Sequence, residues 1–335
     1  MSAAIQAISY YLPPRVLSNA DLNEEFPEWS VDKIAEKTGI LERHIADEDI
    51  CASDLGVESA LRLFREHDVD PAGIDFLMLC TQSPDYFLPT TACLMQDRLG
   101  IPTSAGALDF NLGCSGFVYG LSLARGLIES EAARNVLLIT AETYSKFIHP
   151  RDKSVRTIFG DGAAATLIAG DSGRRGIGPF VFGTDGRGGP NLIVPTGGMR
   201  RHRTGLAKDF DDGEGNTRND DSLFMNGGEI FQFTLQRIPR LVDELLEKAG
   251  LAKGDIDLYV FHQANAFMLD ALRKKLKLPQ ERFYASMAHC ANTVSATIPI
   301  ALADAISMGR LEAGSRAMLV GFGVGYSWAG CIAHF

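Results

Sequence analysis

Cysteine is scarce in this sequence, and its spacing excludes the usual zinc-site and disulfide patterns. The 335 residues include six cysteines at irregular intervals and no Cys-x-x-Cys pair, whereas zinc sites and disulfide-rich secreted domains need regular spacings. No apolar run approaches the ~20 residues that cross a bilayer, and no basic-then-apolar leader opens the chain. The formal net charge of −10 argues against nucleic acid. We therefore expect a cytoplasmic protein without a membrane span or a nucleic-acid partner.

Two parts of the chain repeat one pattern at one distance. Hydrophobic residues make up 46% of the sequence, so a large interior can be buried, and the length exceeds the ~250–300 residues at which single cores stop growing. The matching apolar stretches are residues 74–79 with 256–261 and residues 134–139 with 316–321. Both offsets (256 − 74 and 316 − 134) equal 182. We predict two similar halves, roughly residues 1–172 and 173–335.

Short apolar stretches without alternation are typical of strands buried on both faces of a sheet. On this pattern we expect strands at residues 76–80, 107–110, 136–140, 163–169, 258–261 and 317–320. Segments with helical spacing lie between them, including residues 53–67 and residues 230–249. The second of these ends just before Gly250, where a helix commonly stops. Alternating strands and helices predict an α/β fold in which helices cover the sheets.

One stretch, residues 196–222, breaks this rhythm because it is glycine-rich, charged and without period. A loop of that length is usually functional or partly disordered. Two interpretations stay open: a solvated mobile insert, or a flap near a substrate entrance whose Arg200, Arg201 and Arg203 face phosphates.

One cysteine occupies a position unlike the other five. Cys114 lies in Asn111–Phe117 (NLGCSGF), between an apolar strand and a helix expected at residues 118–129. The positive end of a helix dipole favours a thiolate, so we expect the pKa of Cys114 to lie below ~8.5. The flanking glycines allow a sharp turn, and a backbone amide there can help to bind an oxyanion. The alternative is a cysteine that only fills space in the core.

Three motifs place polar groups at strand or helix ends of the second half. His262 (in FHQAN) follows a predicted strand, where α/β proteins bind ligands. Asn292 (in ANTVSAT) precedes a predicted helix, and the 182-residue offset places it opposite the turn of Cys114. The glycines of Gly321–Trp328 (GFGVGYSW) expose amides, including that of Val324, which could complete an oxyanion hole. Taken alone, His262 could be structural and Asn292 a helix cap.

Taken together and in this order, NLGCSGF, HQAN, ANTVSATIP and GFGVGYSW resemble the motifs of the 3-oxoacyl-[acyl-carrier-protein] synthase III family, a branch of the thiolase-like superfamily. IFGDGAAA, at residues 158–165, is a further match, and the resemblance covers nearly the whole chain. It implies a thiolase-like α/β fold in which two similar halves form a five-layer αβαβα sandwich, and a homodimer.

The resemblance implies a two-stage acyltransferase reaction. Cys114 takes an acyl group from acyl-CoA. Malonyl-acyl carrier protein then loses CO₂ and attacks the acyl-cysteine, which gives a 3-oxoacyl thioester. His262 and Asn292 would donate hydrogen bonds to the developing enolate, and the amides of Cys114 and Val324 would bind an oxyanion. No cofactor is expected, because the CoA thioester is itself a substrate.

The residue type at position 292 favours this decarboxylative reaction. Elongating synthases resemble the family but carry histidine where Asn292 stands, and thiolases have a second cysteine. The product would enter fatty-acid initiation or a related secondary-metabolite pathway.

The implied CoA site is altered in this chain. Lys37 and Lys153 stand where family members carry arginines beside the adenine. Lys33 stands where they carry a stacking tryptophan, with Trp29 one turn earlier. Lysine lacks the planar guanidinium that stacks on a base, so the affinity for CoA or the identity of the donor is open.

The implied acyl and carrier sites also carry changes. Phe87 and Leu88 match the segment that crosses the dimer interface to cap the partner's acyl pocket, and Leu88 replaces a phenylalanine of acetyl-preferring members. The other implied substrate contacts are Gly227, Phe231 and Asn265. A basic patch for an acidic carrier would comprise Arg273, Lys274 and Lys275, with Phe267 in place of an arginine.

Three other functions stay open. The order Cys, His, Asn also occurs in papain-like proteases, but the CGSCW-type signature is missing and an internal repeat has no place in that fold. A non-enzymatic subunit would be expected to have lost one of the three residues. The strongest alternative is a non-decarboxylative acyltransferase, which transfers the acyl group from Cys114 to oxygen or nitrogen.

Overall fold

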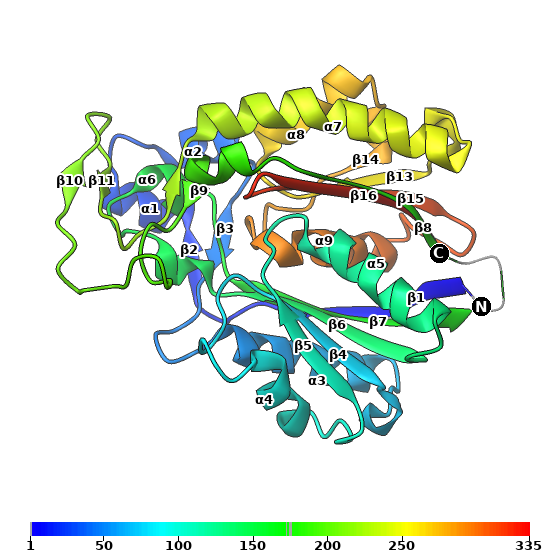
Figure 1. The fold of residues 1–335 in the computed structure, drawn as a ribbon. Helices are drawn as coiled ribbons and strands as arrows, with labels where there is room; N and C mark the ends of the chain where they lie inside the picture. The colour runs from blue at the N-terminus through cyan, green and yellow to red at the C-terminus, as the bar shows by residue number, and fades with distance from the viewer. Residues whose placement is uncertain (1, 172, 174–175) are drawn as a thin grey trace.

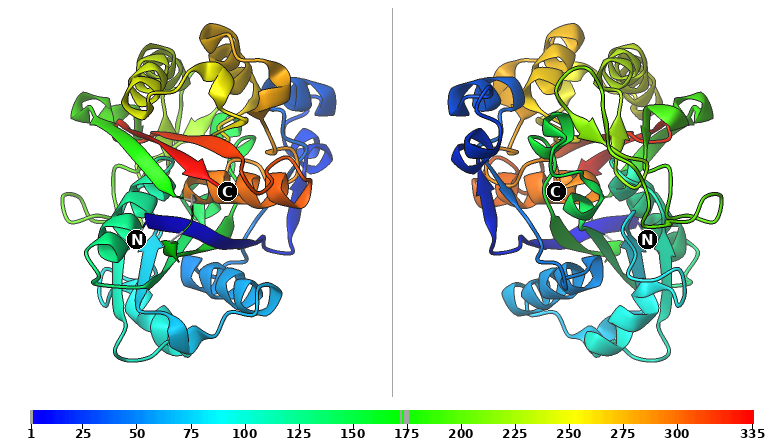
Figure 2. Two further views of the ribbon diagram at one scale, coloured as in Figure 1. Left: turned by 90° about the vertical axis from the view of Figure 1, so that its right-hand side faces the viewer. Right: turned by 90° about the vertical axis from the view of Figure 1, so that its left-hand side faces the viewer.

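The molecule is a stack of five layers in which helices and sheets alternate (Figure 1). The computed structural model describes residues 2–171, 173 and 176–335. Two five-stranded sheets lie on either side of a central helix layer, and an outer helix layer covers each sheet; the same stacking is visible after a 90° turn (Figure 2). The predicted α/β five-layer sandwich is confirmed. No helix in the described part of the chain is long and apolar enough to cross a membrane.

The first sheet contains the strands expected from the apolar runs of the first half. Its order is β1 (Ser2–Tyr11), β7 (Gly162–Asp171), β6 (Asn135–Glu142), β4 (Phe76–Cys80) and β5 (Gly106–Phe110). β4 is parallel to β5 and β6, whereas β7 is antiparallel to β6 and β1. Nearly all side chains of β4 and β6 are buried, because helices cover both faces of these strands.

The second sheet repeats this arrangement. Its order is β14 (Phe283–Tyr284), β13 (Leu258–Phe261), β15 (Arg316–Gly323), β16 (Ser327–His334) and β8 (Ile177–Thr184). β13 is parallel to both neighbours and β16 is antiparallel to both, so β13 and β15 correspond to β4 and β6. The predicted boundary of the halves falls at residue 172, which lies outside the described residues, and the division into two domains stays a prediction.

Helices of three layers cover these sheets. The outer helices are α3 (Ala52–Glu66) and α4 (Thr91–Arg98) on the first sheet, and α7 (Gly227–Ala249) and α8 (Ala266–Leu276) on the second. α7 buries one apolar stripe and stops at Gly250, whose φ of 65° suits glycine. The inner helices, α5 (Gly116–Glu129) and α9 (Thr297–Ser307), are mostly apolar because both sheets enclose them. Each inner helix starts beside a predicted catalytic motif.

Small elements close one end of the sandwich (Figures 1 and 2). They are β2 (Val16–Ser18), α1 (Asn19–Glu25), α2 (Val31–Thr38), β3 (Glu42–His44), α6 (Lys153–Arg156), β9 (Leu192–Ile193), β10 (Phe210–Asp211), β11 (Thr217–Arg218) and β12 (Phe224–Met225). The fully buried Arg43 links two of these elements. It lies in β3, and its Nε donates to the carbonyl of Thr157, the residue after α6, at 3.1 Å. Residues 196–222 thus include a short hairpin, β10–β11, where the sequence showed only an irregular insert.

Candidate active site

Cys114 lies in the turn between β5 and α5, in the middle of the sandwich, and is 5% exposed. The turn leaves no room for side chains on neighbouring glycines. A Cβ at Gly116 would lie 2.2 Å from the Sγ of Cys80, and a Cβ at Gly321 would lie 2.6 Å from the carbonyl oxygen of Cys114. β15 of the second sheet therefore packs directly against the backbone of the turn that carries Cys114.

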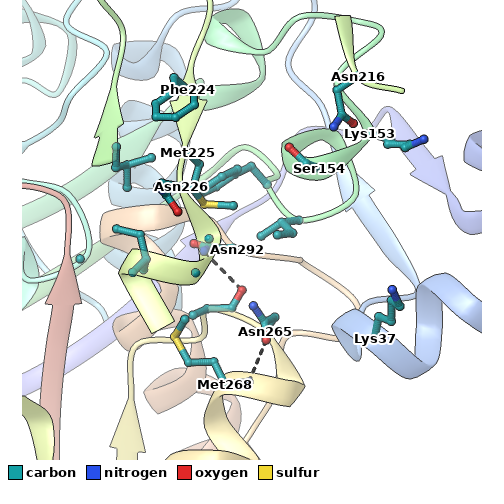
Figure 3. A pocket seen from close by; sticks show the side chains of 18 of the residues that line it. Lys37, Lys153, Ser154, Asn216, Phe224, Met225, Asn226, Asn265, Met268 and Asn292 are labelled. Carbon is teal, nitrogen blue, oxygen red and sulfur yellow. Dashed lines mark hydrogen bonds between the residues drawn. The ribbon is translucent and has the colours of Figure 1, made fainter. Parts of the chain in front are cut away.

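Cys114, His262 and Asn292 line one cavity of about 840 Å³. They come from the start of α5, the end of β13 and the segment before α9, and Cys114 precedes the other two by 148 residues or more (262 − 114). In Figure 3, Asn292 lies near the centre of the cavity lining, and Lys37 and Lys153 lie to one side of it. The fold thus brings together the three residues that the sequence motifs singled out.

His262 is neutral and can act as a hydrogen-bond donor. Its Nδ1 lies 2.7 Å from the hydroxyl of Thr297, which also lies 3.0 Å from the carbonyl oxygen of Val294. A threonine hydroxyl has a single hydrogen, so it donates either to Val294 or to Nδ1. When it donates to Nδ1, the ring proton resides on Nε2. Burial lowers the pKa of His262 to about 3, so the ring is uncharged near neutral pH.

Asn292 is fixed by contacts with both halves of the chain. Its backbone N–H donates to the carbonyl of Ile158 at 3.0 Å, and its side-chain Nδ2 donates to the carbonyl of Ala264 at 3.4 Å. Its Oδ1 accepts from the backbone N–H of Val294 at 2.9 Å. The N-cap of α9 is Ala296, so Asn292 does not cap that helix. The remaining N–H of the side chain is available to a molecule in the cavity.

The expected lowering of the Cys114 pKa was wrong. The pKa of the Cys114 thiol is raised to about 12, mainly by burial and in part by the nearby carboxyl of Glu142 when it is ionised. Hydrogen bonds from backbone amides, including that of Val324, lower it and only partly offset burial. The sequence indicated the helix start but not the loss of water around the sulfur, which favours the uncharged thiol. The Val324 amide hydrogen bonds to the thiol, so it lies next to the sulfur.

Gly323→Ala is expected to slow acylation of Cys114 by roughly a hundredfold, because displacing a reacting group by about 1 Å can have that effect. A Cβ at Gly323 would lie 2.8 Å from the Sγ of Cys114. The rate of acyl-enzyme formation, followed by intact-mass spectrometry, measures it. Gly126→Ala is the matched control, since a Cβ there meets no atom within 4 Å. An unchanged rate in Gly323→Ala would contradict the described packing.

The opening of the cavity is basic and partly neutralised. Lys37 and Lys33 each lie over the ring of Trp29, with Nζ at 5.1 and 5.2 Å from its centroid. Lys153 forms an ion pair with Glu28 at 2.8 Å. Gly227 and Asn265, also predicted to bind substrate, line the same cavity, and the Oδ1 of Asn265 caps α8.

Three predicted substrate residues lie away from this cavity. Phe231 of α7 stacks on Phe267 of α8, with ring centroids 5.2 Å apart, and does not line this cavity. Phe87 lines a second cavity, of about 880 Å³, together with Val324. Leu88 is 82% exposed. In a single chain, Phe87 and Leu88 therefore do not contact the cavity that Cys114 lines.

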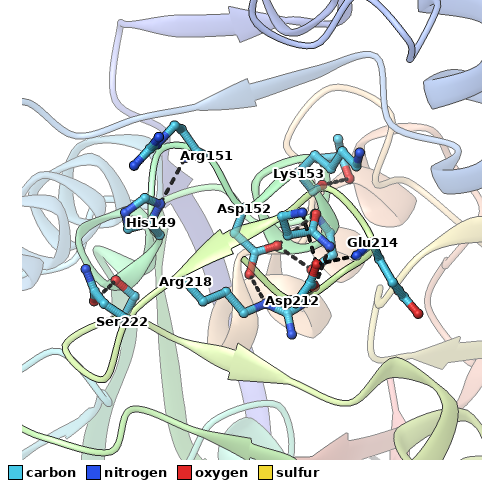
Figure 4. Close-up of polar contacts among 12 residues, drawn as sticks. His149, Arg151, Asp152, Lys153, Asp212, Glu214, Arg218 and Ser222 are labelled. Atoms are coloured by element: carbon cyan, nitrogen blue, oxygen red, sulfur yellow. Dashed lines mark hydrogen bonds and ion pairs between the residues drawn. The ribbon is translucent and has the colours of Figure 1, made fainter. Parts of the chain in front are cut away.

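The β10–β11 hairpin supplies residues that the sequence motifs did not reveal. Asp212, Glu214 and Asn216 line the opening of the Cys114 cavity. Arg218 holds the hairpin in place through Asp152 at 2.8 Å and Asp212 at 3.1 Å (Figure 4). Residues 196–222 thus border the entrance, but with these side chains and not with the predicted arginines. Arg201 instead pairs with Asp220, Arg203 lines the second cavity, and Arg200 lines neither cavity.

Asp152→Ala is expected to lower the free energy of unfolding by about 3 kcal/mol, because it leaves the guanidinium of Arg218 buried with one of its two carboxylates. The side chain of Asp152 is fully buried, and that of Arg218 is 13% exposed. Urea denaturation measures the change. Asp209→Ala removes an exposed carboxylate that pairs with Arg151 and His149 and accepts from Asn219, and it should change stability by less than about 1 kcal/mol. Equal effects would contradict the buried anchor.

Comparison with known proteins gives consistent matches. The family models for 3-oxoacyl-[acyl-carrier-protein] synthase III and for its C-terminal region match residues 108–186 and 246–335. The beta-ketoacyl-[acyl-carrier-protein] synthase III of Caldanaerobacter subterraneus is 37% identical over 99% of this chain and 97% of its own.

Solved structures match over the full length. A crystal structure of a 3-oxoacyl-(acyl-carrier-protein) synthase III is 56% identical, covers 100% of both chains and superposes with a TM-score of 0.98. The priming beta-ketosynthase of the R1128 polyketide pathway is 29% identical, with a TM-score of 0.85 over 100% of this chain and 96% of its own.

Proposed function

Because the chain belongs to the 3-oxoacyl-[acyl-carrier-protein] synthase III family, we propose that it is a condensing enzyme that joins an acyl group from acyl-CoA to malonyl-acyl carrier protein. The observation that carries this proposal is the convergence of Cys114, His262 and Asn292 on one cavity. This constellation combines a nucleophile with two neutral hydrogen-bond donors.

In the first stage, the sulfur of Cys114 attacks the thioester carbonyl of acyl-CoA. The new carbon–sulfur bond forms as the bond to CoA breaks, and the proton that leaves Cys114 ends on the CoA sulfur. The Val324 amide, which hydrogen bonds to the thiol, is placed to stabilise the oxyanion together with the amide of Cys114. The raised pKa of Cys114 makes the thiolate rare until substrate is bound, so this stage depends on such amides.

In the second stage, malonyl-acyl carrier protein loses CO₂ and the resulting enolate attacks the carbonyl of the acyl-cysteine. The carbon–carbon bond forms as the carbon–sulfur bond to Cys114 breaks, and the released thiolate takes up a proton from solvent. Two donors at the thioester oxygen would stabilise that enolate. The side-chain N–H of Asn292 is one, and Nε2 of neutral His262 is the other, provided that Thr297 donates to Nδ1. No cofactor takes part in either stage of this scheme.

The opening of the cavity suits a phosphate-bearing pantetheine arm. Lys33, Lys37 and Lys153 supply positive charge there, and Asn265 and Gly227 border the path inwards. The exposed face of α8 would receive the acidic carrier, although Arg273 and Lys274 both pair with Asp270, at 2.8 and 2.6 Å. This sharing leaves the predicted basic patch weaker than the residue count suggests.

A homodimer would place Phe87 and Leu88 in a partner's acyl pocket. Within the described residues β5 is hydrogen-bonded on one side only, to β4, and an unpaired strand edge is a ready site for a second copy. The adjacent Tyr86, Phe87 and Leu88 are 62%, 76% and 82% exposed, which also favours an interface. The cytoplasmic location stays a prediction.

The two stages can be tested on the same sample. The protein is incubated with short, long and branched acyl-CoAs, followed by intact-mass spectrometry, and malonyl-carrier protein is then added. Formation of an acyl-enzyme that is converted to a 3-oxoacyl product supports the proposal and identifies the starter. A stable acyl-enzyme that malonyl-carrier protein never discharges favours the non-decarboxylative acyltransferase. Failure of every donor to acylate the protein contradicts the proposed nucleophile.

The pathway would be fatty-acid initiation or a related secondary-metabolite route. Similarity to the synthase III of Caldanaerobacter favours the first, and similarity to the R1128 priming ketosynthase is compatible with the second. The starter identified by the acyl-CoA panel would discriminate between them.

A further inference from the structure

A buried carboxyl group that the two-stage scheme does not use lies beside the active site. Glu142 is the last residue of β6 and is 0% exposed. No ion pair joins it to a cation anywhere in the described chain. An isolated buried carboxylate is costly unless it is paired or protonated, so the presence of Glu142 here calls for a physical role.

Glu142 connects segments of both halves. Its Oε1 accepts a hydrogen bond from the hydroxyl of Ser295 at 2.7 Å. Its Oε2 accepts from the backbone N–H of Gln82 at 3.0 Å and from the hydroxyl of Ser83 at 3.2 Å. Ser295 belongs to the turn between Asn292 and Thr297, the partner of His262. One carboxyl group therefore fixes the turn on which both proposed enolate donors depend.

The same group also reaches the nucleophile. Gln82, held by Glu142, packs against the turn of Cys114, because a Cβ on Gly113 would lie 2.5 Å from the Oε1 of Gln82. The negative charge of ionised Glu142 disfavours a thiolate at Cys114. β6 therefore ends in a group that is hydrogen-bonded to segments next to the proposed catalytic residues.

The titratable groups that face Glu142 share its sign when ionised. They are Cys80 at the end of β4, Cys114 before α5, Tyr144 after β6 and Asp161 before β7. Burial raises the pKa of Glu142 to about 8, and the hydrogen bonds from Ser295, Gln82 and Ser83 oppose that rise. The carboxyl is thus mostly protonated at neutral pH and ionises in the mildly alkaline range.

We propose that Glu142 is a positioning residue that holds the Asn292–Thr297 turn against the Cys114 turn and that, on losing its proton, suppresses formation of the Cys114 thiolate. The first part rests on the proposed function. The second part does not, because thiolate reactivity can be measured without substrates. Ionisation of Glu142 would therefore slow the steps that need the Cys114 thiolate.

Glu142→Gln removes the ionisable group at position 142 and keeps nearly the same side-chain shape. The amide oxygen can still accept from Gln82 and Ser83, and the hydroxyl of Ser295 can turn to accept from the new NH₂ group. The rate of alkylation of Cys114 by iodoacetamide is measured from pH 7 to pH 10 by mass spectrometry of the Cys114 peptide. We expect similar rates near pH 7 and, above pH 8, a rate roughly tenfold higher in the variant, corresponding to a pKa change of about one unit.

Tyr144→Phe is the matched control. It removes the hydroxyl that donates to Gln82 at 3.2 Å, so it disturbs the same contacts without removing a charge that forms below pH 10. It should follow the wild-type pH profile. Identical profiles for wild type and Glu142→Gln would overturn the charge effect, and the same divergence in Tyr144→Phe would assign it to packing.

Two further measurements keep the inference testable if alkylation is slow. The folded protein keeps the proton of Glu142 between about pH 4.5, where the unfolded chain loses it, and about pH 8. The wild type should therefore lose stability as the pH rises through this window, and Glu142→Gln should lose less. In the second measurement, Ser295→Ala should slow decarboxylation severalfold and leave acylation unchanged. If the stability of wild type and of Glu142→Gln falls equally with pH, the proposed ionisation of Glu142 is contradicted. If Ser295→Ala decarboxylates at the wild-type rate, the proposed positioning role is contradicted.

Discussion

Cys114→Ala is expected to take up no acyl group from any acyl-CoA and to lose condensation by at least about 10⁴-fold. The sulfur is the only nucleophile that the proposed first stage uses, and removing such a group usually costs that much. Intact-mass spectrometry measures the loss of acylation, and release of the 3-oxoacyl product measures the loss of condensation. Decarboxylation of malonyl-carrier protein should persist at a low rate, because His262 and Asn292 remain in the cavity.

The control for this variant is Cys93→Ala, which removes an exposed cysteine on α4. It should acylate and condense as the wild type does. Loss of acylation in both variants, or retention of a stable acyl group in Cys114→Ala, would contradict the assignment of Cys114 as nucleophile.

His262→Ala is expected to acylate at nearly the wild-type rate but to condense about 10²–10³-fold more slowly, which is the usual effect of removing one oxyanion donor. The ring would act only when the enolate forms, so its loss should leave the first stage intact. Release of labelled CO₂ from malonyl-carrier protein measures the second stage. Asn292→Ala should show the same split between the stages, and a large loss of acylation in either variant would contradict it.

The pH dependence follows from the same environment. Since burial lowers the pKa of His262 to about 3, its neutral form persists from pH 8 down to about pH 4. The decarboxylation rate should therefore show no titration near pH 6.5, the usual value for histidine. The unfolded chain binds this proton below pH 6.5, so the contribution of His262 to stability is complete above that pH and is lost as the pH falls towards 3.

The strands were predictable because helices bury both of their faces. β4 matched its predicted bounds at Phe76–Cys80, and β13 matched at Leu258–Phe261, since an apolar run flanked by polar residues has few alternatives to a strand in a covered sheet. Helix starts were less exact: α7 begins at Gly227 and not at Ile230. The three residues before Ile230 carry no large apolar side chain, and the local signals there are the capping side chain of Asn226 and the acidic Glu229.

Those site residues were predictable that lie at the ends of strands, where α/β proteins bind ligands. Cys114 and His262 follow strands, and strand ends of both halves meet in the middle of the sandwich. The pKa of Cys114 was not predictable, because it depends on burial by the other half. Glu142 was missed because a glutamate at the end of β6 resembles any polar residue that follows a strand. The anchor between Arg218 and Asp152 joins residues 66 positions apart and has no local pattern.

The central claim is that the acyl-cysteine is consumed by a decarboxylative condensation. The most direct test mixes isolated acyl-enzyme with malonyl-carrier protein labelled at the carboxyl carbon, in a single turnover. It follows CO₂ release and the acyl mass on Cys114 together. We expect one CO₂ to appear for each acyl group lost and a 3-oxoacyl thioester to form in the same amount. Loss of the acyl group without CO₂, or CO₂ release while the acyl group remains on Cys114, would contradict it.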